Sequence, residues 1–232
     1  TQLEAIVTIE QAMSKKSFLD EPLEIITGDA EAAINTAKNN LSGSLSIGGQ
    51  EHYYLEGQVA LAIPTEDNEM VVYSSTQNPT EVQHLVAHVL NVPHNAIEVI
   101  TRRMGGGFGG KETDSSQLAC ICAIFAQQTL LPVKSRLSRR DDILMTGKRH
   151  DFVVNYEVGY NDNGQIEGVK IDLAARCGYS LDLSKAIVSR ALFHADNTYY
   201  LSNATFRGFL CKTNTASNTA FRGFGGPQGM LA

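Results

Sequence analysis

The segment of residues 104–112, MGGGFGGKE, holds the densest set of residues that could bind a ligand. Five of its nine residues are glycines, so its backbone can adopt conformations and close approaches that a side chain would prevent. A strand is expected before it, at 96–100, and a helix after it, at 113–127. Such a turn directs backbone N–H groups and the positive end of a helix dipole at one point. The segment therefore predicts a site for an anion, most commonly a phosphate.

Two nucleotide-binding patterns fit parts of this segment. It matches the dinucleotide fingerprint G-x-G-x-x-G and, up to the last position, the P-loop G-x-x-x-x-G-K-[ST]. In the P-loop, the last residue is a Ser or Thr that holds magnesium, whereas the carboxylate of Glu112 would repel a triphosphate. The dinucleotide fingerprint expects an acid about 20 residues further on, where residues 130–132 are Leu, Leu and Pro. Both patterns are therefore disfavoured, and a structural glycine turn is the plainer alternative.

Two other patches mix glycines with polar or aromatic residues. They are residues 48–56, GGQEHYYLE, and residues 218–228, NTAFRGFGGPQ. Each patch alone could be an ordinary turn. Three in one chain favour a shared cleft in which the backbone approaches a ligand.

Two charged residues are candidates for a functional role. Glu112 is expected at a helix start, where the helix dipole would stabilise a carboxylate in any case. Arg190 lies in the apolar context IVSRALF and could equally be a helix-surface residue or part of a buried ion pair. The histidines His84 and His88 are spaced i, i+4 but lack the Glu of H-E-x-x-H, so no zinc site is expected. The four cysteines form no C-x-x-C pair and are expected to be buried, reduced thiols.

The expected helices and strands do not follow a regular βαβ rhythm. Helices are predicted at 9–13, 30–38, 79–90 and 113–127, and strands at 41–47, 59–63, 70–74, 96–100, 131–137, 152–160 and 166–175. The last two strands are joined by NDNG, a strong hairpin signal. The pattern predicts an α+β fold with a mixed or antiparallel sheet packed with helices. Residues 1–25 are expected to be a connecting arm from a preceding domain and 26–232 one domain, in a piece of a longer protein.

The charge and hydropathy of the chain exclude two classes of partner. A formal net charge of −6 argues against a nucleic-acid binder. The basic run at 134–140 is followed at once by Asp141 and Asp142, and a solvated charged face is expected there. No segment approaches 18 uninterrupted apolar residues, so no membrane span is expected. A cytoplasmic location is expected.

Several motifs together resemble the molybdenum-binding portion of the xanthine dehydrogenase family. These motifs occur in the family's order at 48–56, 75–78 (STQN), 103–112, 190–194 (RALFH) and 211–228. The resemblance runs from about residue 26 to the end of the chain. It implies the first molybdopterin-binding domain of the large subunit, incomplete at its C-terminus. It also implies that the anion at the glycine loop is the phosphate-bearing pterin of the molybdenum cofactor, with or without a nucleotide tail.

The resemblance also implies an activity. In the family, a molybdenum centre hydroxylates hypoxanthine and xanthine to urate with oxygen from water, and electrons pass through 2Fe-2S clusters and FAD to NAD. The clusters, the FAD and the remaining molybdenum domain would lie outside this chain, as partner domains or subunits. The family's catalytic base, a glutamate in a later glycine-rich motif, has no counterpart up to Ala232. The chain alone is therefore expected to be inactive.

Five residues match family positions around the cofactor. Gln77 matches the glutamine that hydrogen-bonds a molybdenum oxo ligand. Phe108, between Gly107 and Gly109, matches the loop aromatic whose backbone lies over the metal. Arg222 matches an arginine lining the same centre. The resemblance thus predicts Gln77, Phe108 and Arg222 as contacts of the molybdenum centre.

Three more residues match positions that contact the substrate. Glu112 and Arg190 match the acid and arginine that hold the purine's heteroatoms, and Phe224 matches the ring that stacks on it. Aldehyde oxidases share the glycine motifs but lack this acid and arginine, so the pair favours a purine substrate. A relative that oxidises aldehydes or N-heterocycles is one alternative. Another is a non-catalytic interaction module, for which the three glycine patches would lie apart.

Overall fold

The computed structural model describes residues 4–232, which divide into two compact units. The long-sheet unit comprises the chain up to Gln50, Lys148–Asn218 and Gly223–Ala232. The glycine-loop unit comprises Glu51–Gly147 and Thr219–Arg222. Each unit has a sheet and a hydrophobic core of its own.

The long-sheet unit is built on a five-stranded sheet in the order β1-β9-β8-β7-β2. Its strands are β1 (Leu23–Thr27), β2 (Asn39–Ile47), β7 (Phe152–Tyr160), β8 (Ile166–Gly178) and β9 (Ala204–Lys212). Strands β8 and β9 are parallel, and the other neighbours are antiparallel. The predicted hairpin is the β7–β8 pair, so the NDNG signal is confirmed.

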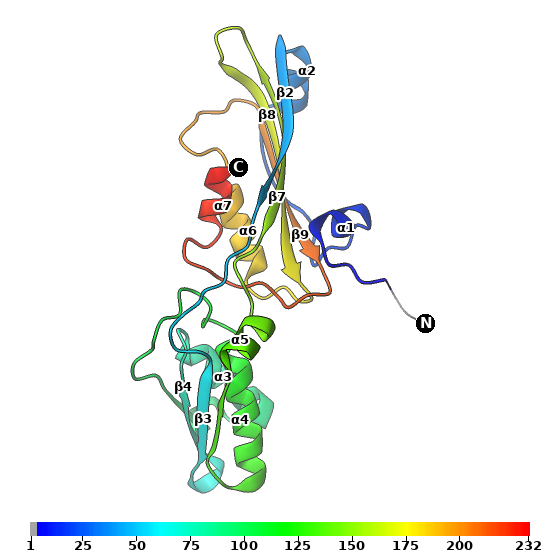
Figure 1. The fold of residues 1–232 in the computed structure, drawn as a ribbon. Helices are drawn as coiled ribbons and strands as arrows, with labels where there is room; N and C mark the ends of the chain where they lie inside the picture. The colour runs from blue at the N-terminus through cyan, green and yellow to red at the C-terminus, as the bar shows by residue number, and fades with distance from the viewer. Residues whose placement is uncertain (1–3) are drawn as a thin grey trace. The chain divides into compact units, whose positions relative to one another are not determined.

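Helices cover both faces of this sheet. Helices α1 (Ile9–Ser14) and α2 (Ala30–Thr36) lie on one face, and α6 (Ser184–Leu192) and α7 (Gly226–Leu231) on the other (Figure 1). Alternation along β8 explains this, because successive residues of a strand point to opposite faces. Leu173 and Ala175 belong to the core cluster shared with α6, whereas Ala174 packs in the cluster shared with α1.

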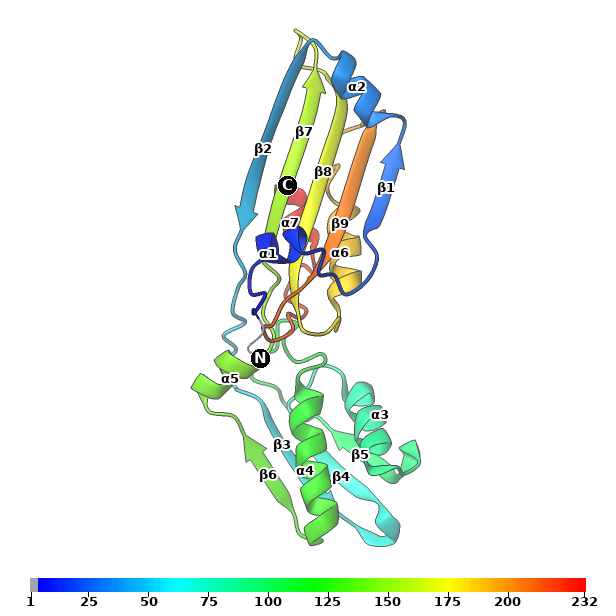
Figure 2. The same cartoon turned by 90° about the vertical axis from the view of Figure 1, so that its right-hand side faces the viewer.

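The glycine-loop unit has a four-stranded sheet in the order β5-β4-β3-β6. Its strands are β3 (Val59–Pro64), β4 (Met70–Ser74), β5 (Ile97–Ile100) and β6 (Val133–Arg136), with short 3-10 turns at Glu66–Asn68 and His94–Ala96. Helices α3 (Pro79–Leu90) and α4 (Ser115–Thr129) pack on one face of the sheet, and α5 (Arg139–Met145) follows β6 (Figure 2). The alternate residues Ala60 and Ala62 of β3, with Val72 of β4, are fully buried in the shared core.

The predicted α+β class is confirmed, with the mixed sheet divided into two. Helix α3 has the predicted bounds, and the side chain of Asn78 caps it by accepting a hydrogen bond from the Glu81 amide at 3.2 Å. The elements that were not predicted are β1, α5, α6, β9 and α7. Helix α4 begins at Ser115, so Glu112 precedes the helix and is not in its first turn. The boundary at residue 25 stays a prediction.

The expected solvated face at 134–142 is wrong in part. Asp142 is buried, and its carboxylate accepts hydrogen bonds from the Tyr54 hydroxyl at 2.6 Å and the Gln58 amide at 2.9 Å. Arg139 donates to the carbonyl oxygens of Tyr54 and Leu55. These polar partners come from a segment more than eighty residues earlier, so local charge patterning could not reveal them.

Two other expectations concern cysteines and membranes. All four cysteines are free thiols; three are buried and Cys120 is partly exposed. Burial raises the pKa of Cys177 and of Cys211 to about 12, so both stay protonated thiols at neutral pH. Between residues 4 and 232, none of the helices combines the length and hydropathy that a membrane span needs.

Candidate functional site

The glycine loop takes a backbone path that most residues cannot follow. Gly106 and Gly109 have φ angles of +91° and +101°, in a region that side chains disfavour. Phe108 between them also has a positive φ, of +55°, and its ring is half exposed. A non-glycine residue held in this conformation is strained, and strain of this kind often marks a functional site.

Most N–H groups of the loop are satisfied within the unit. The Gly105 amide donates to the Glu56 carboxylate at 2.8 Å, and the Gly110 amide donates to the Gly107 carbonyl at 2.8 Å. The Gly109 amide donates to a side chain, Oε1 of Gln77, at 2.8 Å. These amides are therefore not among the N–H groups that the loop can direct at an anion.

The tip of the loop keeps donors for a ligand. Among the described residues, the amides of Gly106, Gly107 and Phe108 have no hydrogen-bond partner. These three amides are therefore available to an anion.

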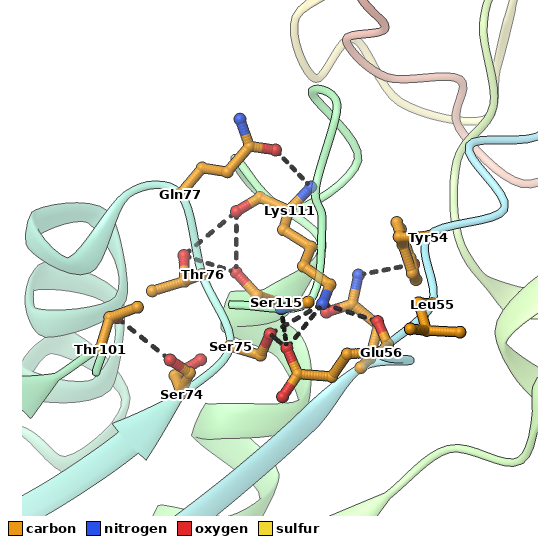
Figure 3. Close-up of polar contacts among 12 residues, drawn as sticks. Tyr54, Leu55, Glu56, Ser74, Ser75, Thr76, Gln77, Thr101, Lys111 and Ser115 are labelled. Carbon is orange, nitrogen blue, oxygen red and sulfur yellow. Dashed lines mark hydrogen bonds and ion pairs between the residues drawn. The ribbon is translucent and has the colours of Figure 1, made fainter. Parts of the chain in front are cut away.

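Gln77 is fixed against the loop on one side and open on the other. Its backbone amide donates to the Lys111 carbonyl at 2.8 Å, and its Oε1 also accepts from the Lys111 amide at 3.3 Å. With both bonds directed to Oε1, the amide nitrogen Nε2 points away from the loop (Figure 3). Within residues 4–232, Nε2 has no partner. Gln77 is therefore an exposed, oriented hydrogen-bond donor.

The glycines permit contacts that a Cβ would block. A Cβ on Gly107 would lie 2.4 Å from Oε1 of Gln77, and one on Gly109 would lie 2.7 Å from the carbonyl oxygen of Ala220. A Cβ on Gly110 would lie 2.7 Å from the ring of His52. Contacts under 3.0 Å do not occur for real Cβ atoms. The glycine pattern therefore packs the loop against three distant parts of the chain, at His52, Gln77 and Ala220.

All three glycine-containing patches contribute residues to this one unit. Nε2 of His52 donates to the carbonyl oxygen of Ala220 at 2.6 Å, and the His52 ring lies 4.8 Å from that of Phe221. The Arg222 amide donates to the carbonyl oxygen of Phe108 at 2.9 Å. The interaction-module alternative required the patches to lie apart, and these contacts contradict it for residues 51–56, 105–112 and 219–222.

An ion pair between a buried lysine, Lys111, and a partly exposed glutamate, Glu56, lies beneath the loop. Lys111 is 0% exposed, and its Nζ donates to the Ser75 hydroxyl and the Glu56 carbonyl, each at 2.7 Å (Figure 3). Nζ also lies 3.4 Å from the Glu56 carboxylate and 4.6 Å from the centre of the Tyr54 ring. Burial lowers the pKa of Lys111 against the opposing effect of Glu56.

Glu56 is held as a carboxylate by the same groups. Burial alone would raise its pKa, but hydrogen bonds from Ser75 and Gly105, together with the Lys111 ammonium, outweigh burial and lower the pKa. The Ser75 hydroxyl donates to it at 2.6 Å.

A second set of buried polar groups holds the other end of the loop. The amide of Gln58 donates from Nε2 to the Gly110 carbonyl at 3.1 Å and to the Tyr54 hydroxyl at 3.0 Å. Burial, with Asp142 as its hydrogen-bond acceptor, raises the pKa of Tyr54. Sequence reasoning assigned no role to Lys111, Glu56, Gln58 or Tyr54. The only signal was that a Lys, a Glu and a Tyr occur inside glycine-rich patches.

Three predicted site residues are placed as follows. Glu112 is part-buried in the glycine-loop unit, and its amide donates to the Gly109 carbonyl at 3.4 Å. Arg190 and Phe224 lie in the long-sheet unit. Arg190 is exposed in the last turn of α6, with its Nε 3.5 Å from Nε2 of His194. Phe224 has a φ of +47° and lies two residues before the start of α7, which packs on α6.

The glycine-loop unit thus brings together Gln77, Gly107, Phe108, Gly109 and Arg222. Among the described residues, its donors without a partner are the Gln77 side-chain amide and three loop amides, which suit the oxygen atoms of an anionic group. Among residues 4–232 no group of three His, Cys, Asp or Glu side chains could hold a metal directly. The donor set therefore suits a ligand that is held through hydrogen bonds to its oxygen atoms.

Comparisons with known proteins agree with this donor set. Residues 12–232 match the family described as the molybdopterin cofactor-binding domain. The chain is 48% identical over 230 residues to the xanthine dehydrogenase/oxidase of Felis catus and 48% identical over 231 residues to the xanthine dehydrogenase of Emericella nidulans. Each alignment covers 99% of this chain but 17% of the relative, so the chain spans about a sixth of their length.

A solved structure shows the same fold. The aldehyde oxidoreductase of Desulfovibrio gigas superposes with a TM-score of 0.90 over 100% of this chain and 26% of that protein, at 22% identity.

Proposed function

Because the chain belongs to the molybdopterin cofactor-binding domain family, we propose that it forms part of a cytoplasmic molybdenum hydroxylase that oxidises hypoxanthine and xanthine to urate. The observation that carries this proposal is the 48% identity to xanthine dehydrogenases across 99% of the chain. The presence of both Glu112 and Arg190 supports a purine over an aldehyde. The electrons leave through 2Fe-2S clusters and FAD to NAD, in segments outside this chain. Residues 26–232 form the cofactor-binding domain and 1–25 its connecting arm.

The residues around the glycine loop hold the cofactor. When bound, the molybdenum cofactor supplies oxygen transfer from water and accepts two electrons. Nε2 of Gln77 donates a hydrogen bond to an oxygen atom of this group, because Oε1 is already engaged by the loop. The amides at Gly107 and Phe108 and the guanidinium of Arg222 supply further donors. Fixed donors of this kind need no reorganisation when charge develops on an oxygen atom.

The substrate residues orient and stabilise a flat heterocycle. Addition of an oxygen nucleophile to a purine carbon would place negative charge on the ring heteroatoms until hydride leaves that carbon with its electron pair. The Arg190 guanidinium would favour that charge more in the transition state than in the ground state. One such donor is worth about 3–4 kcal/mol. Glu112 hydrogen-bonds a ring heteroatom and selects the carbon that reacts. Phe224 adds about 1 kcal/mol of stacking and fixes the ring plane.

The test of the purine assignment is Arg190→Ala in the complete enzyme, meaning this chain with the further sequence that its relatives carry. We expect kcat/KM for xanthine to fall about 10²–10³-fold, the cost of one lost donor to a developing oxyanion. Activity toward a small aldehyde should change far less. Lys185→Ala on the same helix is the matched control, since Lys185 pairs with Asp20 on the surface. Equal losses with both substrates would point to an aldehyde- or N-heterocycle-oxidising enzyme.

The isolated chain of 232 residues provides a second test. It lacks the glutamate base expected further along the relatives, so we expect no urate from xanthine and no stoichiometric molybdenum. Elemental analysis and a urate assay measure both. Turnover by this chain alone would overturn the assignment of the base to another segment.

A further inference from the structure

We propose that Lys111 is a positioning residue whose buried ammonium, paired with Glu56, holds the glycine loop and Gln77 in the conformation that binds the cofactor. This inference rests on the proposed function only for the identity of the ligand. The conformational part concerns the chain by itself.

The first argument is the burial of a full charge. Lysines are almost never fully buried unless they are paired, and the ammonium of Lys111 has no exposed surface. Its three donors match three acceptors: the Ser75 hydroxyl, the Glu56 carbonyl and the Glu56 carboxylate. The Tyr54 ring closes the remaining side at 4.6 Å. The site is therefore fully formed around one ammonium group.

The second argument is what this pair holds in place. The Glu56 carboxylate that faces Lys111 also accepts the Gly105 amide, at the start of the loop. The main chain of Lys111, at the end of the loop, exchanges two hydrogen bonds with Gln77: one to its backbone amide and one to its Oε1. One residue thus joins the start of the loop, through its side chain, to Gln77, through its backbone (Figure 3).

A second layer makes the backbone of Lys111 rigid. Its carbonyl oxygen accepts from the Thr76 hydroxyl at 3.1 Å and from the Ser115 hydroxyl at 3.3 Å, and the two hydroxyls bond each other at 2.8 Å. Thr76 precedes Gln77, and Ser115 opens α4. Lys111 therefore links Gln77 to the start of α4.

Stability alone does not explain an ion pair in which one charge, that of Lys111, is fully buried. Replacing such a pair by well-packed apolar residues is often neutral or stabilising, because desolvation offsets the attraction. What an ion pair does supply is a fixed geometry. Here the ion pair fixes the positions of the two ends of the loop, whose tip carries Phe108. The backbone of Lys111 also helps to fix Oε1 of Gln77 toward the loop, so that Nε2 faces outward.

The experiment uses Lys111→Met, which keeps the length of the apolar stem and removes the ammonium. Glu56→Gln tests the other partner. The first readout is hydrogen–deuterium exchange at the amides of Gly105 and Gly109 in the complete enzyme without cofactor. We expect both variants to speed exchange at these amides about tenfold, the effect of losing about one charge-assisted hydrogen bond. The second readout is molybdenum content after cofactor loading. If the loop conformation that binds the cofactor becomes about tenfold less populated, the apparent affinity for the cofactor falls by the same factor of about ten.

Val86→Ala is the matched control, because Val86 is fully buried in the core of the same unit and contacts no loop residue through a hydrogen bond. It should speed exchange across the unit evenly and leave molybdenum content per folded protein unchanged. Unchanged exchange at Gly105 and Gly109 in Lys111→Met, or a pattern equal to that of Val86→Ala, would overturn the inference. A third outcome is that Lys111→Met speeds exchange at the loop while the unmutated enzyme takes up no molybdenum. That outcome would support the positioning role and refute the proposed function.

Discussion

Replacing Gly109 by alanine tests whether the glycine loop is shaped by packing against distant backbone. Gly109 has a φ of +101°, and Gly164, in the β7–β8 turn, has a φ of +77°. Alanine in either place incurs strain of about 1–2 kcal/mol, partly offset by a loss of freedom in the unfolded chain of about 0.4–1 kcal/mol. The two sites differ in their surroundings. A Cβ at Gly164 meets nothing within 4 Å, whereas one at Gly109 lies 2.7 Å from the carbonyl oxygen of Ala220 and 3.0 Å from the Cα of Phe221.

The clash is with backbone, which cannot rotate away as a side chain can. Forcing an atom into a packed site costs about 1–3 kcal/mol. We therefore expect Gly109→Ala to lower the free energy of unfolding by about 2–4 kcal/mol and Gly164→Ala by about 1 kcal/mol or less, combining the strain and clash terms. Urea unfolding followed by circular dichroism measures both, and amide exchange assigns each loss to its unit. Exchange of the Arg222 amide should also rise in Gly109→Ala, since that amide donates to Phe108. Equal costs for the two variants would refute the role of packing.

Three further predictions concern stability. His150 is buried, and burial lowers its pKa from 6.5 to about 3. Between these two pH values the unfolded chain binds a proton that the folded chain does not. The free energy of unfolding should therefore fall as pH drops from 6.5 to 3, by at most about 1.4 kcal/mol per pH unit. His150→Gln should show a shallower fall in urea midpoints over this range, and an identical slope would contradict the assignment. Asn78→Ala removes the cap of α3 and should cost about 1 kcal/mol in thermal unfolding, whereas no change would mean that water replaces the cap. Tyr54→Phe removes the hydroxyl that donates to buried Asp142 at 2.6 Å; it should cost about 1–3 kcal/mol, and a neutral effect in urea unfolding would show that Asp142 finds another donor.

Much of the fold could be predicted because its signals are local. The Pro and Asn at the start of α3, the alternation of β3 and β4 and the NDNG turn each act within a few residues. Strand β9 was missed although Ala204, Phe206 and Leu210 alternate and are buried. Its parallel pairing with β8 follows a connection that contains α6, and no local pattern indicates a partner.

The motifs singled out residues for the site but could not give the hydrogen bonds among them. The motifs indicated that Gln77, Phe108 and Arg222 matter, and the glycines indicated close backbone approach. The purpose of the glycines was misjudged in part, because several loop amides bond to Glu56 and Gln77 and do not face an anion. Side-chain acceptors more than thirty residues away in the sequence compete for the same amides, and only the tertiary structure shows that they lie beside the loop.

The sequence by itself determined the family, the α+β class and the identities of the polar residues, because these depend on residue type, spacing and order. Only the tertiary structure decided that the lysine after the last glycine is a fully buried ammonium and that Gln77 offers its nitrogen and not its oxygen. The reason is physical: burial and hydrogen-bond direction depend on which distant groups surround an atom. Folding brings those neighbours together from distant positions in the sequence, so the spacing of residues along the chain does not reveal them.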